Sequence, residues 1–168
     1  MREAQQRDAR LIAAVHVRAW RAAYRGLLPD ALLDALSVDE RERSWRELLG
    51  ETHGRSLTLV AGDDADTVEG FCALSTPSRD DDADERTAEI AATYVEPNRW
   101  RAGVGTLLLD VALGRLRRDG YEQATLWVFA ENDRARSFYE RFGFEPDGGE
   151  DQHDWSGGLL EVRLRARL

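Results

Sequence analysis

The chain has 168 residues, of which 42% are hydrophobic and 33% charged, and its formal charge at pH 7 is −9. This length predicts a single domain spanning residues 1–168 with a sizeable core. The acidic balance argues against a nucleic-acid partner, since such proteins need a basic face to replace counterions. The single cysteine fits a reducing compartment. We find neither a signal peptide nor a long apolar span, so a cytoplasmic protein with no membrane partner is expected.

The N-terminal segment predicts a short strand within residues 1–5, followed by an amphipathic helix. Asp8 can cap this helix, and apolar residues recur along it at helical spacing. Gly26 and Pro29 then end the helix and begin another element.

Three ring-bearing side chains lie on this helix. Trp20 and Tyr24 are four residues apart on one face, so either core packing or contact with a bound substrate explains them. His16 fits a hydrogen-bonded structural histidine better than a catalytic base.

Residues 37–75 predict a helix and a β-hairpin. A capping box at residues 37–40 begins a helix that runs from Glu40 to Leu49. Two strands follow, at Leu57–Ala61 and Val68–Ser75, and a polar turn at Gly62–Asp66 joins them.

Two features near this hairpin could carry chemistry. Cys72 lies in the middle of the second strand without an evident histidine partner, so it fits a small buried residue. The acidic loop at Pro77–Arg86 is expected to be mobile and solvated. It contains no histidine and no calcium-loop pattern, so no metal site is predicted.

The central segment predicts a strand, a glycine-containing turn and a helix, in that order. The strand at Ile90–Val95 stops at Pro97, the turn extends to Gly105, and a mostly buried helix runs from Thr106 to Gly120. The free N–H groups and the dipole at a helix N-terminus favour an anion there. Taken alone, this segment fits phosphate binding and an ordinary turn about equally well.

The remaining sequence predicts a strand, a short helix and a final hairpin. The strand lies at Ala124–Phe129, and Asn132 or Asp133 caps a helix that ends at Gly143. Strands at Gly148–Trp155 and Leu159–Leu168 form the hairpin. Apolar and charged residues alternate in the last strand, and we expect its charged row, which includes Arg163, to be a solvated sheet face.

Two motifs stand out in the second half of the chain. They are Pro97-Asn-Arg-Trp-Arg-Ala-Gly103-Val-Gly105 and Asn132-x-x-Ala135-x-x-Phe138-Tyr139-x-x-Phe142-Gly143-Phe144. Together they resemble the core of the GNAT superfamily of N-acetyltransferases. The resemblance implies an α/β fold, with a mixed, mostly antiparallel sheet of six to seven strands and helices on both faces. It also implies acetyl-CoA as co-substrate, no metal, and a small-molecule or peptide amine as acceptor; a homodimer is left open.

The resemblance also implies site residues. Tyr139 matches the family's general acid, and Glu89 stands where a glutamate often acts as base, directly or through water. The first two helices line the acceptor side, which makes Trp20 and Tyr24 candidate acceptor contacts. Residues implied to hold the donor are Tyr94, Val95, Arg101, Ala102, Gly103, Val104, Gly105, Thr106 and Asn132.

One position departs from the family's pattern. The family usually writes Q/R-x-x-G-x-G/A, and the Q/R position falls on Trp100. The side chain that contacts phosphate is therefore open between Arg99 and Arg101, with Arg101 favoured. Transfer of another acyl group, or an acyl-CoA-binding sensor or partner-binding protein without turnover, are the alternative functions.

Overall fold

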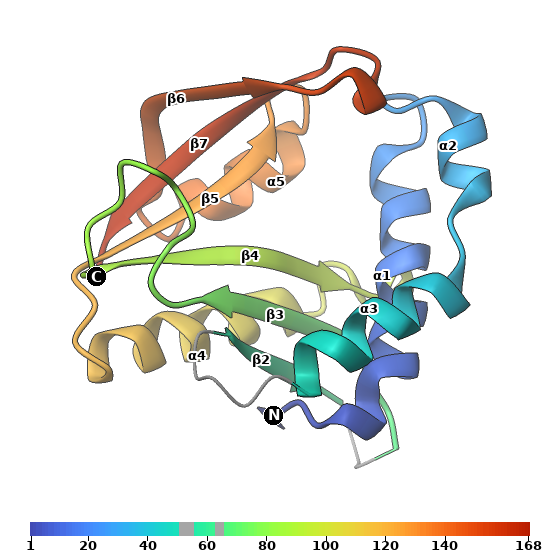
Figure 1. Ribbon diagram of the computed structural model, residues 1–168, viewed down its shortest axis with the longest axis horizontal. Helices are drawn as coiled ribbons and strands as arrows, with labels where there is room; N and C mark the ends of the chain where they lie inside the picture. The colour runs from blue at the N-terminus through green and yellow to red at the C-terminus, as the bar shows by residue number, and fades with distance from the viewer. Residues whose placement is uncertain (51–55, 63–65) are drawn as a thin grey trace.

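The computed structural model describes residues 1–50, 56–62 and 66–168 (Figure 1). The predicted turn at Gly62–Asp66 falls mostly on residues 63–65, outside the described residues. The elements, with η for a short 3-10 helix, are β1 (Arg2–Glu3), η1 (Gln6–Asp8), α1 (Ala9–Tyr24), α2 (Asp30–Ala35), α3 (Val38–Gly50), β2 (Ser56–Ala61), β3 (Gly70–Ser75), β4 (Thr87–Val95), η2 (Pro97–Arg99), α4 (Val104–Arg118), β5 (Gln123–Phe129), α5 (Asp133–Glu140), β6 (Glu145–Gln152), η3 (Asp154–Ser156) and β7 (Leu160–Arg167).

Within the described residues, seven strands form one sheet in the order β1-β2-β3-β4-β5-β7-β6. Among these described strands only β4 and β5 run parallel, and α4 connects them, while the other neighbouring strands are antiparallel. The prediction of a mixed, mostly antiparallel sheet is confirmed. The penultimate strand begins earlier than predicted, because the chain turns at Gly143 (φ 82°) and Phe144 enters the core at once.

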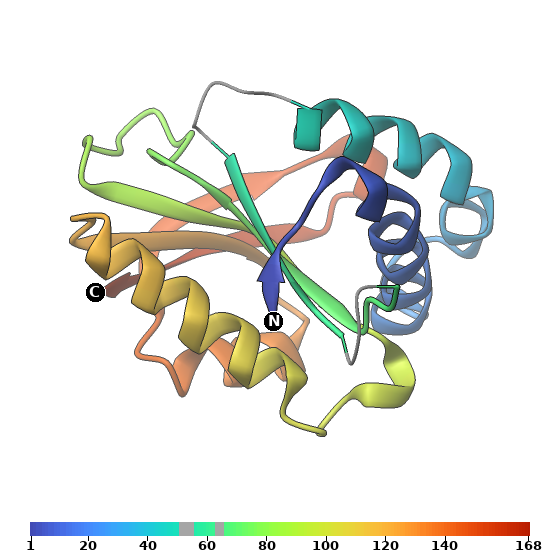
Figure 2. The same ribbon diagram turned by 90° about the horizontal axis from the view of Figure 1, so that it is seen from below.

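Helices cover both faces of the sheet (Figures 1 and 2). The buried face of α4 packs on β2, β3 and β4, in a core that includes Leu108, Leu116 and the fully buried Cys72. On the opposite face, α1 and α3 enclose a second core around Ile12, Trp45 and Phe71. The two faces are therefore sealed by different parts of the chain.

The start of α1 differs from the predicted cap. Asp8 directly precedes the helix, but its side chain forms no cap hydrogen bond to it. The carboxylate instead accepts hydrogen bonds from the Arg2 guanidinium at 2.6 and 2.7 Å and from the Gln5 N–H at 2.7 Å. Asp8 thus fixes the N-terminal strand beside the helix.

The pairing of β4 with β5 is short. It covers three residue pairs, from Thr87 and Gln123 to Glu89 and Thr125. Ala91 is then an extra residue in β4, because Leu74 of β3 lies opposite Ile90 while the preceding residue of β3 lies opposite Ala92. Such a bulge bends a strand. Beyond it the two strands separate toward their C-terminal ends, as Figure 1 shows.

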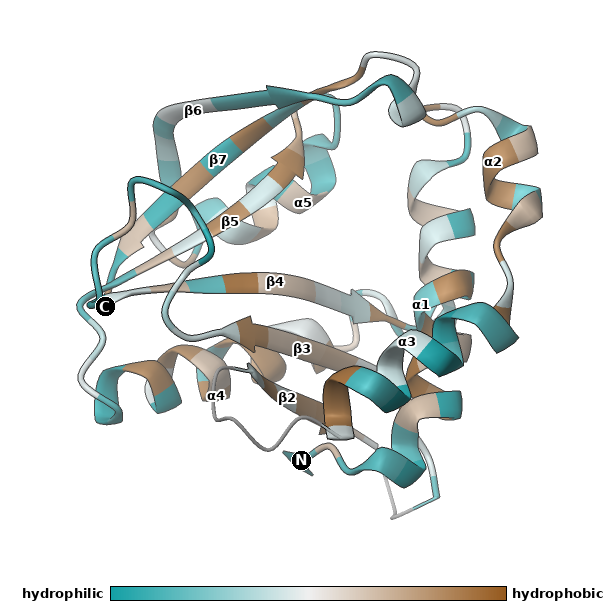
Figure 3. Cartoon of the chain, in the orientation of Figure 1, coloured by the Kyte–Doolittle hydropathy of each residue, from teal (hydrophilic) through white to brown (hydrophobic). Residues whose placement is uncertain are grey.

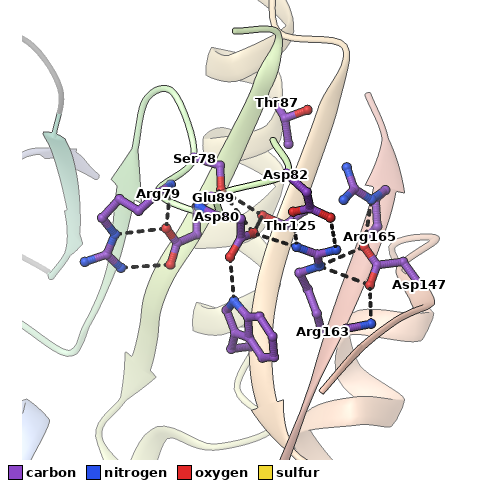
Figure 4. Close-up of polar contacts among 12 residues, drawn as sticks. Ser78, Arg79, Asp80, Asp82, Thr87, Glu89, Thr125, Asp147, Arg163 and Arg165 are labelled. Atoms are coloured by element: carbon purple, nitrogen blue, oxygen red, sulfur yellow. Dashed lines mark hydrogen bonds and ion pairs between the residues drawn. The ribbon is translucent and has the colours of Figure 1, made fainter. Parts of the chain in front are cut away.

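The loop at residues 77–86 is tied to the sheet through Arg79, Asp80 and Asp82 (Figure 4), while six of its ten residues are exposed, so the prediction of a solvated loop is right only in part. Arg79 donates to both oxygens of Glu89 at 3.0 and 2.8 Å. Asp80 accepts hydrogen bonds from Trp127 Nε1 at 2.9 Å and from Thr125 Oγ1 at 3.0 Å. These contacts join the loop to residues 10 to 47 positions away, which local composition cannot predict.

The charged row of β7 is also not a plain solvated face. Figure 3 shows the predicted alternation of hydrophobic and hydrophilic residues along this strand, but the Arg163 side chain is only 9% exposed. Its guanidinium donates to Asp82 at 2.6 and 2.7 Å and to Asp147 at 2.9 and 3.0 Å, and lies 3.5 Å from Asp80. Three carboxylates from the loop and β6 therefore cover this arginine.

The part of the chain that the structure describes contains no helix long and apolar enough to span a bilayer. Over the same residues, no cluster of three or more metal-binding side chains occurs.

We expect Arg163→Met to lower the free energy of unfolding by about 3 kcal/mol, measured by urea denaturation. Removing one partner of a buried ion pair leaves the remaining charges poorly compensated, and Asp147 would keep its bond from Arg165 but lose those from Arg163. The Asp80 and Asp147 side chains are only 10% and 14% exposed.

Arg86→Met is the matched control, because Arg86 and its partner Glu122 are both largely exposed. Its cost should be at most about 1 kcal/mol. Equal effects of the two substitutions would show that the Arg163 cluster contributes no more than a surface pair.

Candidate active site

The turn before α4 has the geometry of an anion site. Gly103 stands at the helix N-cap with φ 87°, a left-handed conformation that glycine adopts without strain. No atom lies within 4 Å of where a Cβ would be, so the space above this glycine is open. The first N–H groups of α4 have no intrahelical partners, and the helix dipole favours an anion beside them. A phosphate group could therefore approach the backbone closely.

A cavity of about 560 Å³ leads from this turn into the gap between β4 and β5. The glycine turn, the two separated strands, α5 and one side of α1 line it. Of the residues predicted from the sequence, those that line it are Tyr24, Tyr94, Val95, Arg101, Gly103, Gly105, Thr106, Asn132 and Tyr139. Ala102 lies in the turn and Val104 begins α4, each between lining residues.

Trp100, which occupies the family's Q/R position, contacts Arg134, an arginine that the sequence analysis did not identify as a site residue. The Arg134 guanidinium lies 3.6 Å from the centre of the Trp100 ring, within cation–π range. Burial lowers the pKa of Arg134 from its ordinary value, and the charge of Arg101 adds to this effect. Both Arg134 and Arg101 line the cavity beside the glycine turn. A phosphate there would lie beside both guanidinium groups and offset the repulsion between them.

The backbone of β4 presents polar groups to this cavity. The N–H of Glu96 bonds to Glu69, on the β3 side of the strand. Backbone groups alternate in direction along a strand, so the N–H and C=O of Val95 point the opposite way, into the gap. Trp100 Nε1 donates to this carbonyl at 2.9 Å. The Val95 N–H thus faces the place where β5 has moved away.

Helix α5 places Asn132 and Tyr139 on the cavity wall. The Asn132 side chain caps the helix by accepting from the Ala135 N–H at 3.2 Å. Tyr139 is buried, and burial raises the pKa of its phenol above the ordinary value, although a hydrogen bond with Thr93 opposes the shift. The phenol is therefore a neutral hydrogen-bond donor throughout the neutral pH range.

A second cavity, of about 440 Å³, opens on the other side of the strand gap. It contains Trp20 and Glu89, two predicted site residues that do not line the first cavity. Glu89 is buried and held by Arg79 through both carboxylate oxygens. The residues that line both cavities are Tyr24, Ala91, Tyr94, Trp127 and Val128.

Aromatic packing fixes the wall between the cavities. The hydroxyls of Tyr24 and Tyr94 lie 3.2 Å apart. His16 stacks on Tyr94 at 4.8 Å between ring centres and accepts a hydrogen bond from Trp45 at 3.3 Å. Burial lowers the pKa of His16 to about 3, so it is a neutral structural histidine, in agreement with the interpretation from the sequence. Sequence reasoning missed Trp155 and Glu161 of the second cavity, which come from the final hairpin.

Comparisons with known proteins agree with this geometry. The model of the Acetyltransferase (GNAT) family matches residues 10–144. The Bacillus subtilis protein YuaI, named as an uncharacterized N-acetyltransferase, is 32% identical over 167 residues, covering 98% of this chain and 90% of its own. Rv2775 of Mycobacterium tuberculosis, also named an N-acetyltransferase, is 28% identical over 160 residues, covering 88% and 80%.

A solved structure shares the fold. The PaiA N-acetyltransferase from Thermoplasma acidophilum, in complex with coenzyme A, superposes with a TM-score of 0.78 at 22% identity, over 99% of this chain and 97% of that one. At 22% identity, this likeness shows that the two proteins share a fold.

We expect Arg134→Met to weaken coenzyme A binding by about tenfold to a hundredfold in titration calorimetry. A hydrogen bond to a charged group contributes roughly 1.5–3 kcal/mol, and about 1.4 kcal/mol corresponds to tenfold in affinity. Trp100→Ala should weaken binding in the same direction, because it removes the ring on which Arg134 rests.

Arg117→Met provides the control, because Arg117 is exposed in the last turn of α4, away from the cavity. Its affinity for coenzyme A should equal that of the unsubstituted protein. Unchanged affinity in Arg134→Met would leave Arg101 as the phosphate contact.

Proposed function

Because the chain belongs to the GNAT acetyltransferase family, we propose that it moves an acetyl group from acetyl-CoA to a primary amine by direct attack in a ternary complex. The observation that carries this proposal is the pair of cavities that meet at the strand gap and share five residues. One cavity has an anion cradle for the donor, and the other has carboxylates and aromatic rings for an amine. Both ligands would reach the gap from opposite sides.

In this proposal the donor lies along β4. Its pyrophosphate binds the N–H groups of the Gly103–Gly105 turn, with Arg101 and Arg134 beside it. The pantetheine arm extends into the gap past Asn132. The Val95 N–H and the other β4 N–H groups that point into the gap can donate to the carbonyls of the arm, and the group that reaches the thioester carbonyl stabilises the negative charge that develops on its oxygen during attack. The alternation of the β4 backbone and the Trp100 bond to the Val95 carbonyl support this placement.

Tyr139 is proposed to assist the leaving group. The amine nitrogen bonds to the carbonyl carbon, the C–S bond breaks, and the sulfur departs with the electron pair. An ordinary thiol has a pKa of about 8.5, below that of a phenol at about 10, so partial proton donation from Tyr139 is sufficient. Burial keeps this donor protonated, although the hydrogen bond with Thr93 opposes the rise in its pKa.

Glu89 is proposed to take the proton that the amine loses, directly or through a water molecule. The carboxylate lies in the second cavity, next to the shared wall. Its two oxygens already accept from Arg79, which fixes their direction. A carboxylate oxygen has a second lone pair, so this ion pair orients the base without blocking it.

The family match supports an acyl-CoA donor, and acetyl as the transferred group is part of our proposal. A single domain, a cytoplasmic location and a homodimer stay predictions from the sequence.

Tyr139→Phe removes one hydroxyl and little volume, so the fold should persist. We expect kcat to fall at least about tenfold, since acid catalysis contributes roughly 10²–10⁴-fold where it operates. Acetyl-CoA affinity should change little, the pattern of an interaction made mainly in the transition state. Release of thiol from acetyl-CoA measures the rate.

Tyr121→Phe is the matched control, since Tyr121 follows α4 and lines neither cavity. Its kcat should match that of the unsubstituted enzyme. If Tyr139→Phe also keeps a normal kcat under conditions where chemistry limits the rate, water or another residue is the acid.

Glu89→Gln keeps the side chain's shape and removes its basicity. We expect its activity to fall most at low pH, where the free amine is scarce and a base matters most. Coenzyme A affinity should stay nearly intact, because Glu89 does not line the donor cavity. Rates equal to those of the unsubstituted enzyme from about pH 6 to 9 would exclude Glu89 as the base.

A further inference from the structure

The second cavity contains two kinds of wall. One is aromatic, formed by Trp20, Phe129 and Trp155. The rings of Trp20 and Trp155 are stacked with centres 6.2 Å apart, and Phe129 lies 6.2 Å from Trp155. The Trp155 residue is 47% exposed, which is unusual for so large an apolar side chain. An exposed indole at the mouth of a cavity fits ligand contact better than core packing.

The other wall is acidic, and arginines pair with its carboxylates at one end only. Glu89 and Asp80 lie near one end and pair with Arg79 and Arg163. At the other end the Glu161 side chain is only 21% exposed. In the described part of the chain its ion-pair partner is His153, at 3.8 Å.

His153 also lies next to a second carboxylate. It lies 3.4 Å from Asp151 and stacks on Trp155 with ring centres 5.7 Å apart. One imidazole therefore stands between two carboxylates and can offset at most one of their charges. Burial raises the pKa of Glu161, and the neighbouring Asp151 adds to this while His153 opposes it. A cation bound here would relieve the cost of burying Glu161.

The two ends of the second cavity would contact different parts of the acceptor. Ala91 and Tyr94 line both cavities, and Glu89 stands two residues before Ala91 on β4, so the nitrogen that is acetylated must sit on this side. Glu161, Asp151 and Trp155 come from the final hairpin, at the rim of the cavity. They are available for another part of the acceptor.

Resting on the proposed function, we infer that this cavity selects an acceptor that carries a second cationic group, a diamine or polyamine. One amine is acetylated beside Glu89 while a second ammonium binds Glu161 and Asp151 against the Trp155 ring. Carboxylates and aromatic faces both attract ammonium groups. The net charge of −9 favours the approach of such a substrate.

The test compares acceptors of one length that differ in the far group: 1,4-diaminobutane, 4-aminobutan-1-ol and butylamine. We expect kcat/KM for the diamine to exceed that for the amino alcohol at least about thirtyfold, an effect of about 2 kcal/mol. In Glu161→Gln this preference should fall to within about threefold, mainly through KM. Trp155→Leu, which keeps an apolar side chain without a π face, should also reduce the preference.

Glu150→Gln is the matched control, because Glu150 is exposed on the same hairpin and does not line the cavity. It should keep the full preference for the diamine. Equal kcat/KM for diamine and amino alcohol, or an undiminished preference in Glu161→Gln, would overturn the inference.

A binding measurement separates this inference from the proposed function. If no amine is acetylated, the proposed function fails, and calorimetry with the diamine and the amino alcohol in the presence of coenzyme A then decides the cation site. Diamine binding that requires Glu161 supports the site. The absence of any difference between the two ligands contradicts it.

Discussion

Both cavities depend on one constraint, the end of the pairing between β4 and β5. Only three residue pairs join these parallel strands, and beyond them each strand has backbone groups with no strand partner on that side. Buried backbone groups must find a partner. Trp100 satisfies one of them, the Val95 carbonyl, and an extended ligand can satisfy others. The separation that weakens the sheet is thus the feature that makes room for chemistry.

The polar cluster of Figure 4 lies at the last of these pairs. Glu89 and Thr125 are the final partners across the two strands, and each is held by one of two consecutive loop residues, Arg79 and Asp80. Asp80 also reaches Trp127, on the part of β5 that has begun to diverge. The loop therefore fixes both strands at the vertex of the gap. Stability and the geometry of the site depend on the same few contacts.

Features that depend on residues close together in the sequence could be predicted, whereas contacts between distant segments could not. The strand, glycine turn and helix around Gly103 follow from local spacing, and the alternation that ends at Leu168 follows from strand period; the structure has both. The burial of Arg163 depends on a partner 81 residues away, and the stack of Arg134 on Trp100 joins two separate segments. Neither contact produces a periodic pattern in the sequence. Composition alone therefore did not predict that the loop is tied to the sheet or that Arg163 is buried.

The two cavities also differ in which parts of the sequence form their walls. Apart from one side of α1, the first cavity is built from the continuous stretch between residues 90 and 141, whereas the second draws on α1, the folded loop, both central strands and the final hairpin. A substitution at the hairpin can reshape the second cavity without touching the glycine turn. If the two cavities bind acceptor and donor as proposed, a lineage can exchange one acceptor for another while the donor-binding half is inherited intact.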